Sequence, residues 1–292
     1  MSAILDAYPD LKRDLKFFPL GVRSPQKLTK AQIEHYNERG YIAPISIFDE
    51  TEIAAIRGYF DELLPKALEA GWNSYEIVNW HKHCRGVWDI VTQPKILDYV
   101  QDLVGDTVIL RHSHFFTKLP GDGKRVSWHQ DASYWPLSPS KVVSAWLAID
   151  DVDESNAAMH IIPRSHLNAQ VPFSESTPEE HNVLNQTVSN PQQYGDAPVS
   201  LNLRAGQISL HSDWILHASE PNNSPRRRCG FAMRFLSSDV RAFNGWNQHG
   251  VVCRGADPSG HWVHNPRPDG EYIPVKVHEA EPASHGWTDR DK

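Results

Sequence analysis

The strongest constraint on the fold is a change in the pattern of residue types near residue 107. From there to residue 236, the chain consists of short runs rich in β-branched and aromatic residues, with polar turns between them. These runs span 107–116, 142–149, 199–203, 207–210 and 229–236. Short strands separated by turns rather than helices favour an antiparallel barrel or a roll of two sheets. We therefore predict a mostly β core over about 106–236.

The residues before this core have the periodicity of helices. Thr29 precedes an apolar pattern that stops at Gly40, which suits a hydroxyl N-cap and a glycine C-cap. A second pattern starts at Asp49 and should end before Pro65, because proline interrupts helical hydrogen bonding. The spacing predicts a third helix over about 94–103.

The length of 292 residues fits one large domain. We expect a single domain over 1–292, with a helical region over about 28–105 in front of the core and a C-terminal tail over 237–292. The polar stretch 167–197 contains Pro and Gly and has no period. We predict a long loop there with the role of a lid, since long loops in compact domains are more often functional.

Composition excludes several classes of protein. Lys plus Arg is 29 and Asp plus Glu is 36, so the formal charge of -7 argues against a nucleic-acid partner. The longest apolar run, 142–149, is too short to span a membrane, and charged residues interrupt residues 1–18. Three cysteines without a CxxC pair make a disulfide scaffold improbable. We expect a soluble cytoplasmic protein with a small-molecule partner and no membrane partner.

The sharpest motif is Trp128-His129-Gln130-Asp131. In a strand, residues two apart share a face, so His129 and Asp131 can reach one point while Gln130 faces away. An imidazole and a carboxylate supply two of the three ligands of the facial triad that holds non-haem Fe(II). By itself, a His-x-Asp tripeptide is more often a surface histidine and aspartate than a metal site.

A second block supplies a candidate third ligand. His217 is followed by Ser219 and Asn222, and then by three arginines, 226–228, that open a predicted strand. A guanidinium beside a metal would bind one carboxylate of a dicarboxylate through two parallel hydrogen bonds. His211 is an alternative third ligand, although it lacks the block that follows His217. The other histidines expected to be packing or surface residues are His81, His83, His112, His160 and His166.

Over about 28–236, the sequence resembles the phytanoyl-CoA dioxygenase family of Fe(II)/2-oxoglutarate oxygenases. The matching blocks, in order, are Leu28-Thr29-x-x-Gln32 leading to Gly40-Tyr41, His129-Gln130-Asp131 with Tyr134 and Pro136, Trp146, Asn156, Ile162-Pro163, Ser165-His166, His217-x-Ser219 with Asn222, and Arg228. The resemblance implies a double-stranded β-helix core of the jelly-roll, cupin-like type, with α-helices packed on it. It also implies an oxidoreductase that uses Fe(II), 2-oxoglutarate and O2.

The resemblance further assigns roles to individual residues. The implied metal ligands, which form the catalytic centre, are His129, Asp131 and His217. The implied cosubstrate-binding residues are Arg228, Trp146, His114 and Ser219, with Arg228 on the far carboxylate of 2-oxoglutarate. Two residues depart from the family's pattern: Ala157 and Arg164 stand where relatives usually have Gly, in turns expected to lie away from the ligands.

Alternation along the strand that follows the arginines extends this reading. If Arg228 points into the core, then Gly230, Ala232 and Arg234 share its face. The two small residues would leave room for the cosubstrate. Arg234 would then be either a partner in a structural ion pair or an anchor for an anionic substrate.

The carboxylate at Asp131 bears on the reaction type. Halogenases that resemble this family have Ala or Gly there, which opens a site for chloride. We therefore expect hydroxylation or a related oxidation, with release of succinate and CO2.

The candidate substrate-binding residues are Asn79, His81, Tyr134, Trp135 and Arg234. Aromatic faces with cationic groups suit a small polar metabolite, such as an amino-phosphonate or a natural-product intermediate. Three alternatives stay open: an acyl-CoA hydroxylase of the same family, a non-catalytic metal- and ligand-binding barrel, and a zinc hydrolase using the same ligands.

Overall fold

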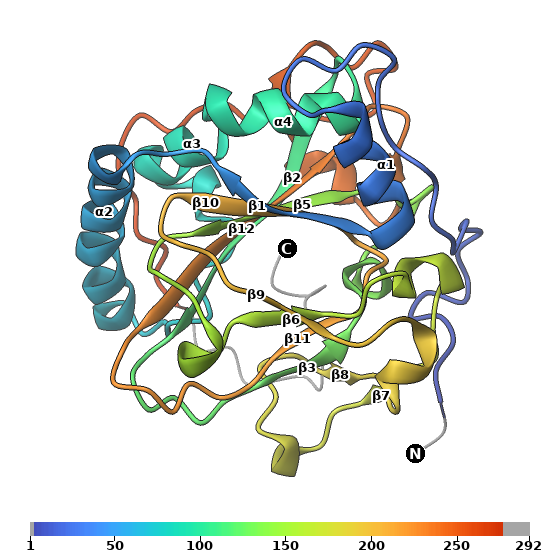
Figure 1. The fold of residues 1–292 in the computed structure, drawn as a ribbon. Helices are drawn as coiled ribbons and strands as arrows, with labels where there is room; N and C mark the ends of the chain where they lie inside the picture. Colours follow the sequence, from blue (N-terminus) through green and yellow to red (C-terminus); the bar gives the residue numbers. More distant parts are fainter. Residues whose placement is uncertain (1–2, 277–292) are drawn as a thin grey trace.

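The computed structural model describes residues 3–276, and two antiparallel β-sheets facing each other form its centre (Figure 1). The larger sheet contains, in spatial order, β1 (Tyr41–Ser46), β10 (Gln207–Ser212), β5 (Val143–Ala148), β12 (Arg228–Leu236), β2 (Val108–Lys118) and β14 (Val251–Arg254). The smaller sheet contains β3 (Val126–His129), β11 (His217–Ser219), β6 (Met159–Ile161) and β9 (Val199–Leu201). The mostly β fold predicted from the sequence is confirmed.

Helices cover the outer face of the larger sheet (Figure 1). They are α1 (Lys30–Arg39), α2 (Glu50–Glu69), α3 (Arg85–Val91) and α4 (Pro94–Val104). The main hydrophobic cluster joins helix and sheet: Phe60 of α2 stacks on Phe115 of β2, which stacks on Phe231 of β12. The outward residues of β12 thus pack against the helices, which leaves the opposite face of the strand for the space between the sheets.

Local signals placed α1 and α4 correctly. The Thr29 side chain accepts a hydrogen bond from the Gln32 amide, and the Gln32 side chain accepts one from the Thr29 amide. Gly40 ends α1 with φ of 88°, a left-handed conformation that costs glycine little. The expected helix over 94–103 is confirmed as α4, followed by Gly105.

The expected end of the second helix is wrong. Helix α2 continues through Pro65 to Glu69. The proline removes one backbone hydrogen bond, but Leu63, Leu64 and Ala67 are buried around it. Packing against the sheet therefore holds the last turn in place despite the interruption.

Two strands of the larger sheet lie outside the core range expected from the sequence. Strand β1 pairs with β10 at one edge, and β14 pairs with β2 at the other. The region expected to be a wrapping tail therefore supplies β14, and also β13 (Arg241–Ala242), which pairs with β4 (Leu137–Ser138). The remainder of the expected tail, 277–292, lies outside the described residues.

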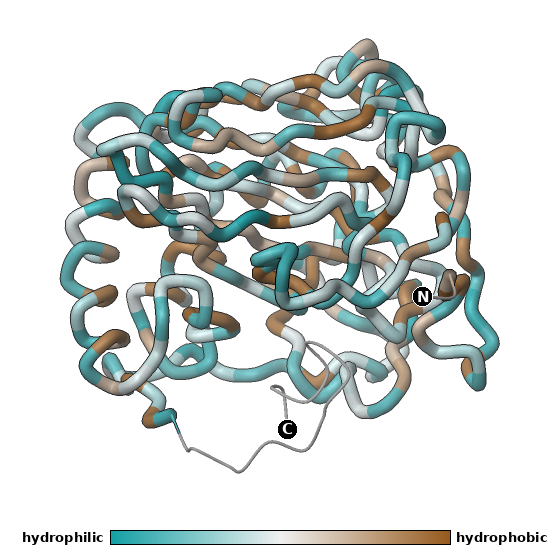
Figure 2. The backbone as a smooth tube through the Cα atoms, turned by 90° about the horizontal axis from the view of Figure 1, so that it is seen from below, coloured by the Kyte–Doolittle hydropathy of each residue, from teal (hydrophilic) through white to brown (hydrophobic). Residues whose placement is uncertain are grey.

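The stretch 167–197 is more ordered than a loop. It contains the hairpin of β7 (Ser174–Glu175) and β8 (Gln186–Thr187). Val171, Phe173 and Val188 are buried in a small cluster beside the smaller sheet. Figure 2, which views the molecule from below, shows hydrophilic and hydrophobic residues interspersed along the whole backbone. The role of a lid stays a prediction.

Across residues 3–276, we find no helix with both the length and the apolar character needed to cross a membrane.

Candidate metal centre

Strand pairing brings the two distant histidines together. Strand β11 pairs with β3 so that His217 lies directly opposite His129, with ring centroids 4.1 Å apart. His129 ends β3, and Asp131 begins the 3-10 turn Asp131–Tyr134, so the expectation that both residues lie in a strand is wrong for Asp131. The intervening Gln130 has an extended backbone, however. Its side-chain amide donates to the Trp214 carbonyl, so the side chain faces away from the two candidate ligands as expected.

The three side chains converge on one point. Asp131 Oδ1 lies 3.6 Å from His129 Nε2 and 3.8 Å from His217 Nε2. The three candidate ligand atoms all lie within 4.8 Å of one another. Within the described part of the chain, no other set of three His, Cys, Asp or Glu residues is so arranged.

Both imidazoles are oriented by backbone carbonyls. His129 Nδ1 donates to the Ser127 carbonyl at 2.8 Å, and His217 Nδ1 donates to the Ile215 carbonyl at 3.0 Å. A proton held on Nδ1 leaves the Nε2 lone pair directed at the common point, as metal-binding histidines require. Burial and the neighbouring His129 also hold the pKa of His217 well below its usual value, which keeps this ring neutral.

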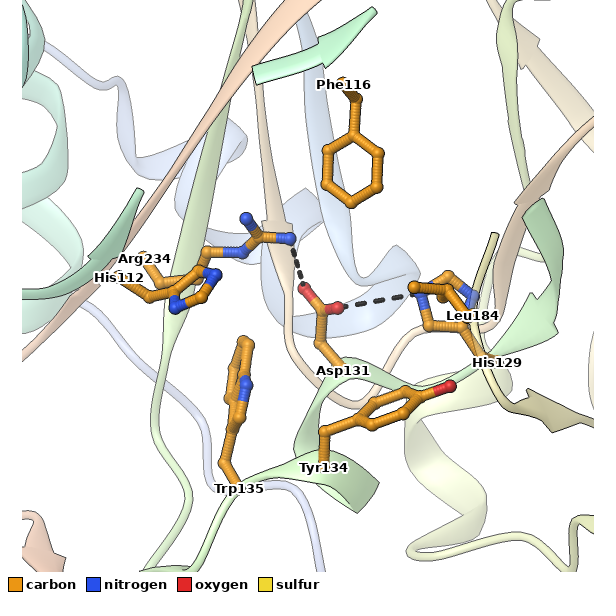
Figure 3. Close-up of a pocket in the computed structure, with 8 residues that line it drawn as sticks. All are labelled: His112, Phe116, His129, Asp131, Tyr134, Trp135, Leu184 and Arg234. Carbon is orange, nitrogen blue, oxygen red and sulfur yellow. Dashed lines mark hydrogen bonds and ion pairs between the residues drawn. The ribbon is translucent and has the colours of Figure 1, made fainter. Parts of the chain in front are cut away.

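The two oxygens of Asp131 have different environments (Figure 3). Oδ1 faces the imidazoles, whereas Oδ2 accepts a hydrogen bond from Ser144 Oγ at 3.2 Å and lies 3.5 Å from Arg234 Nη2. Burial by itself would raise the pKa of Asp131, but Arg234 and the two imidazoles outweigh it and hold that pKa well below its usual range. The group is therefore an anion with one oxygen available to a cation. This donor set of two imidazoles and a carboxylate fits a non-haem Fe(II) site.

The three consecutive arginines have separate surroundings. Arg226 pairs with Asp153 at 2.7 Å, and Arg227 pairs with Asp150 at 2.8 Å. Arg228 is buried, and its guanidinium donates to the Ala157 and Phe116 carbonyls and to Ser219 Oγ. Within residues 3–276 it pairs with no carboxylate, and burial lowers its pKa to about 10. A buried guanidinium without a counterion is suited to an incoming anion.

A cavity of about 410 Å³ extends from the histidines to Arg228. Trp146 of β5 lines it, and its ring lies 5.6 Å from the Arg228 guanidinium carbon. The alternation predicted for β12 is confirmed, because Arg228, Ala232 and Arg234 all line this cavity.

The expectation that Gly230 leaves room for a cosubstrate is wrong. A Cβ atom on Gly230 would lie 1.8 Å from Trp146 Cζ2, so the indole fills the space above this glycine.

Ala157 and Arg164, which stand where the family usually has glycine, adopt the backbone conformation that glycine favours. Ala157 has φ of 70° and Arg164 has φ of 69°. The Ala157 carbonyl accepts a hydrogen bond from Nε of Arg228, the predicted cosubstrate residue, at 3.1 Å. Its turn thus helps to position the guanidinium.

A second cavity, of about 290 Å³, lies on the Asp131 side (Figure 3). Of the candidate substrate residues, Tyr134, Trp135 and Arg234 line it. Asn79 and His81 line neither cavity. Both instead contact Ser113, and the Asn79 amide donates to the Ser113 carbonyl at 2.7 Å, so this segment extends the edge of β2.

His114 also lies outside the lining of both cavities, and its Nε2 contacts the Tyr75 carbonyl at 2.7 Å. Its neighbours on the same face of β2, His112 and Phe116, line the second cavity, and Phe116 lines both. Alternation along β2 could have identified these two residues. His112 was expected to be a packing residue. Leu184, from the stretch predicted as a lid, also lines the second cavity, and no local signal marked it.

His211 lines the first cavity but is not part of the convergent group. Its ring centroid lies 5.3 Å from that of His217. The alternative that His211 is the third ligand therefore finds no support in the geometry.

Comparison with known proteins gives consistent matches. Residues 36–230 match the model of the phytanoyl-CoA dioxygenase family. The peroxisomal phytanoyl-CoA dioxygenase of Homo sapiens is 24% identical over 236 residues, covering 73% of this chain and 69% of that protein. A probable alpha-ketoglutarate-dependent hypophosphite dioxygenase of Stutzerimonas stutzeri is 26% identical over 171 residues, covering 58% of each chain. The solved structure of CytC3 with Fe(II) and alpha-ketoglutarate superposes with a TM-score of 0.61 at 19% identity, covering 87% of this chain and 98% of that one.

Proposed function

The chain belongs to the phytanoyl-CoA dioxygenase family, and from this membership we propose that it is an Fe(II)- and 2-oxoglutarate-dependent dioxygenase that hydroxylates a small polar metabolite. The observation that carries the proposal is the position of the three convergent side chains next to a cavity that ends at Arg228. A metal centre and an unpaired buried cation in one cavity are what a chelating dicarboxylate cosubstrate requires.

In this proposal, His129 Nε2, Asp131 Oδ1 and His217 Nε2 hold Fe(II). The backbone carbonyls of Ser127 and Ile215 keep the two rings in the required tautomer. Ser144 and Arg234 hold the second oxygen of the carboxylate. With 2-oxoglutarate, the bound iron supplies the activation of O2, which yields succinate, CO2 and oxidation of a substrate C–H bond.

Arg228 binds the carboxylate of 2-oxoglutarate that is remote from the metal. Ser219 and the Ala157 carbonyl fix the guanidinium, and Trp146 forms the wall beside it. Because the space around Arg228 is buried, the charge-assisted hydrogen bonds to the carboxylate form away from competing water. Asp131 occupies the ligand position that would otherwise be open to a halide, which favours hydroxylation.

We also infer that the protein acts in the cytoplasm. Cys84, Cys229 and Cys253 are all free thiols, which suits a reducing compartment.

The test is succinate formation by purified protein supplied with Fe(II), 2-oxoglutarate and O2, alone and with a metabolite panel. We expect turnover by the wild type and its loss in His129→Ala and His217→Ala, together with loss of stoichiometric Fe(II) binding. Arg228→Gln should raise KM for 2-oxoglutarate by at least tenfold while Fe(II) binding persists.

Arg226→Gln is the matched control. Its arginine is exposed and paired with Asp153, so the kinetics should stay those of the wild type. Fe(II) binding without succinate formation across the panel would favour a non-catalytic barrel. Metal-dependent hydrolysis without O2 would favour a zinc hydrolase, and turnover only with acyl-CoA would contradict the small polar substrate.

A further inference from the structure

The contact with Asp131 uses only one terminal nitrogen of Arg234 and leaves the rest of its guanidinium without a role. Arg234 lies on the same face of β12 as Arg228, is 6% exposed, and lines both cavities. In Figure 3, its guanidinium lies between Asp131, His112 and the rings of Phe116 and Trp135. The aromatic centroids are 5.7 Å and 5.9 Å from its central carbon. Of the residues that line the second cavity, it is the only arginine.

The hydrogen bonds of Arg234 are incomplete. Nη2 is 3.5 Å from Asp131 Oδ2, at the outer limit of a hydrogen bond. Nε and Nη1 are buried and have no hydrogen-bond partner among residues 3–276. A guanidinium removed from water with two donor atoms unpaired is costly unless a ligand supplies acceptors. Asp131 cannot fully compensate its charge, because the other oxygen of that carboxylate faces the metal site.

The remaining walls of the cavity suit a small molecule with one charged end. Phe116, Tyr134, Trp135 and Leu184 present rings or an alkyl group, and His112 contributes an imidazole beside the guanidinium. A guanidinium and an imidazole beside mostly aromatic walls favour a compact metabolite with one anionic end over a long acyl chain on a large carrier.

We propose that Arg234 anchors an oxyanion on the primary substrate, so that the enzyme oxidises a small organic acid held in the second cavity. This inference rests on the proposed function for the identity of the reaction, but the anion site itself is defined by Arg234. Arg228 and Arg234, six residues apart on one face of β12, thus divide the two anions between them. Arg228 takes the cosubstrate and Arg234 the substrate. The oxyanion is a carboxylate or a phosphorus acid, since a guanidinium binds both in the same forked manner.

Calorimetric titration of the Fe(II)-loaded protein, saturated with 2-oxoglutarate and free of oxygen, tests the assignment. The probes are butyrate, propylphosphonate and butyramide, the last being the neutral isostere of butyrate. We expect one of the two acids to bind the wild type at least tenfold more tightly than the amide, and the preferred acid identifies the oxyanion. Arg234→Gln should raise the dissociation constant of that acid about ten- to a hundredfold and leave the dissociation constant of the amide unchanged.

Three further measurements separate anchoring from other roles. Because Arg234 also contacts Asp131 Oδ2, Arg234→Gln should weaken the binding of Fe(II) and of 2-oxoglutarate, but by a smaller factor than it weakens the binding of the acid. Arg234→Lys, which retains charge but not the fork, should recover part of the acid affinity. Arg228 is the matched buried arginine. Arg228→Gln should weaken the binding of 2-oxoglutarate, and the affinity for the acid should stay that of the wild type once the cosubstrate is raised to saturation.

Equal binding of acids and amide by the wild type would overturn the assignment. So would a loss of Fe(II) or 2-oxoglutarate affinity in Arg234→Gln as large as the loss of acid affinity, because Arg234 would then only position Asp131. Failure of the proposed function looks different: succinate is absent, while the discrimination between acid and amide remains measurable.

Discussion

Gly230 and Trp146 depend on each other at the scale of single residues. The indole of Trp146 occupies the space above the glycine and also borders Arg228. Without a side chain at 230, the ring can lie flat in the inter-sheet space and form a wall of the cosubstrate cavity. The space that Gly230 was expected to leave for the cosubstrate is instead taken by the Trp146 ring.

Gly230→Ala should therefore displace Trp146 from the cavity wall. The added methyl group would meet the ring at 1.8 Å, and overpacking of this kind costs about 1–3 kcal/mol. We expect a lower free energy of unfolding in urea, together with a higher KM for 2-oxoglutarate. The control is Gly58→Ala on the exposed side of α2, where a Cβ meets nothing within 4 Å. That change should stabilise the protein by about 0.5–1 kcal/mol, and equal effects of the two substitutions would refute the explanation.

At the scale of elements, the end of α1 is supported by a buried histidine. The His166 ring packs edge-on against Phe17, with centroids 4.5 Å apart, and its Nε2 contacts the Asn37 carbonyl at 3.1 Å. Burial lowers the pKa of His166 to about 4. The folded protein therefore holds this ring neutral at pH values where the unfolded chain, with a pKa of about 6.5, protonates it.

Stability should consequently fall as the pH drops from about 6.5 to about 4. In this window the unfolded state binds the extra proton, so acid favours unfolding, by up to about 3 kcal/mol from this residue. Urea unfolding of His166→Gln at a series of pH values should show a shallower decline than the wild type. His35→Gln, at an exposed position of α1, should follow the wild type. Parallel curves for wild type and His166→Gln would contradict the assignment.

At the scale of the whole molecule, the helical layer and the sheets share one hydrophobic cluster. Tyr36 of α1, Phe60 of α2 and Ile96 of α4 belong to the same cluster as Phe115 and Phe231 of the larger sheet. Neither layer can bury its apolar face without the other. We therefore propose that the helical region, the core and the described part of the tail form a single domain.

Differential scanning calorimetry should accordingly give one unfolding transition, with equal calorimetric and van't Hoff enthalpies. A variant that weakens only the helical layer, Phe60→Ala, should lower the midpoint of that one transition, since the loss of a buried phenyl ring costs about 3–5 kcal/mol. Two resolved transitions, only one of them sensitive to Phe60→Ala, would show separate domains.

Much of the candidate site was predictable because it depends on short-range geometry. The alternation of β12 placed Arg228, Ala232 and Arg234 on one face. His129 and Asp131 still point to the same side, although β3 ends at His129. Asn79 and His81 line neither of the two cavities, and polar and aromatic composition by itself cannot distinguish a cavity wall from the edge of a strand.

Local signals were enough to predict the caps of α1, the alternating strands and the candidate metal-binding side chains. The pairing of β11 with β3, which sets His217 opposite His129, and the addition of β1 and β14 to the larger sheet became known only from the folded chain. Periodicity records which face of a strand is buried, whereas the choice of neighbouring strand depends on packing across the whole core.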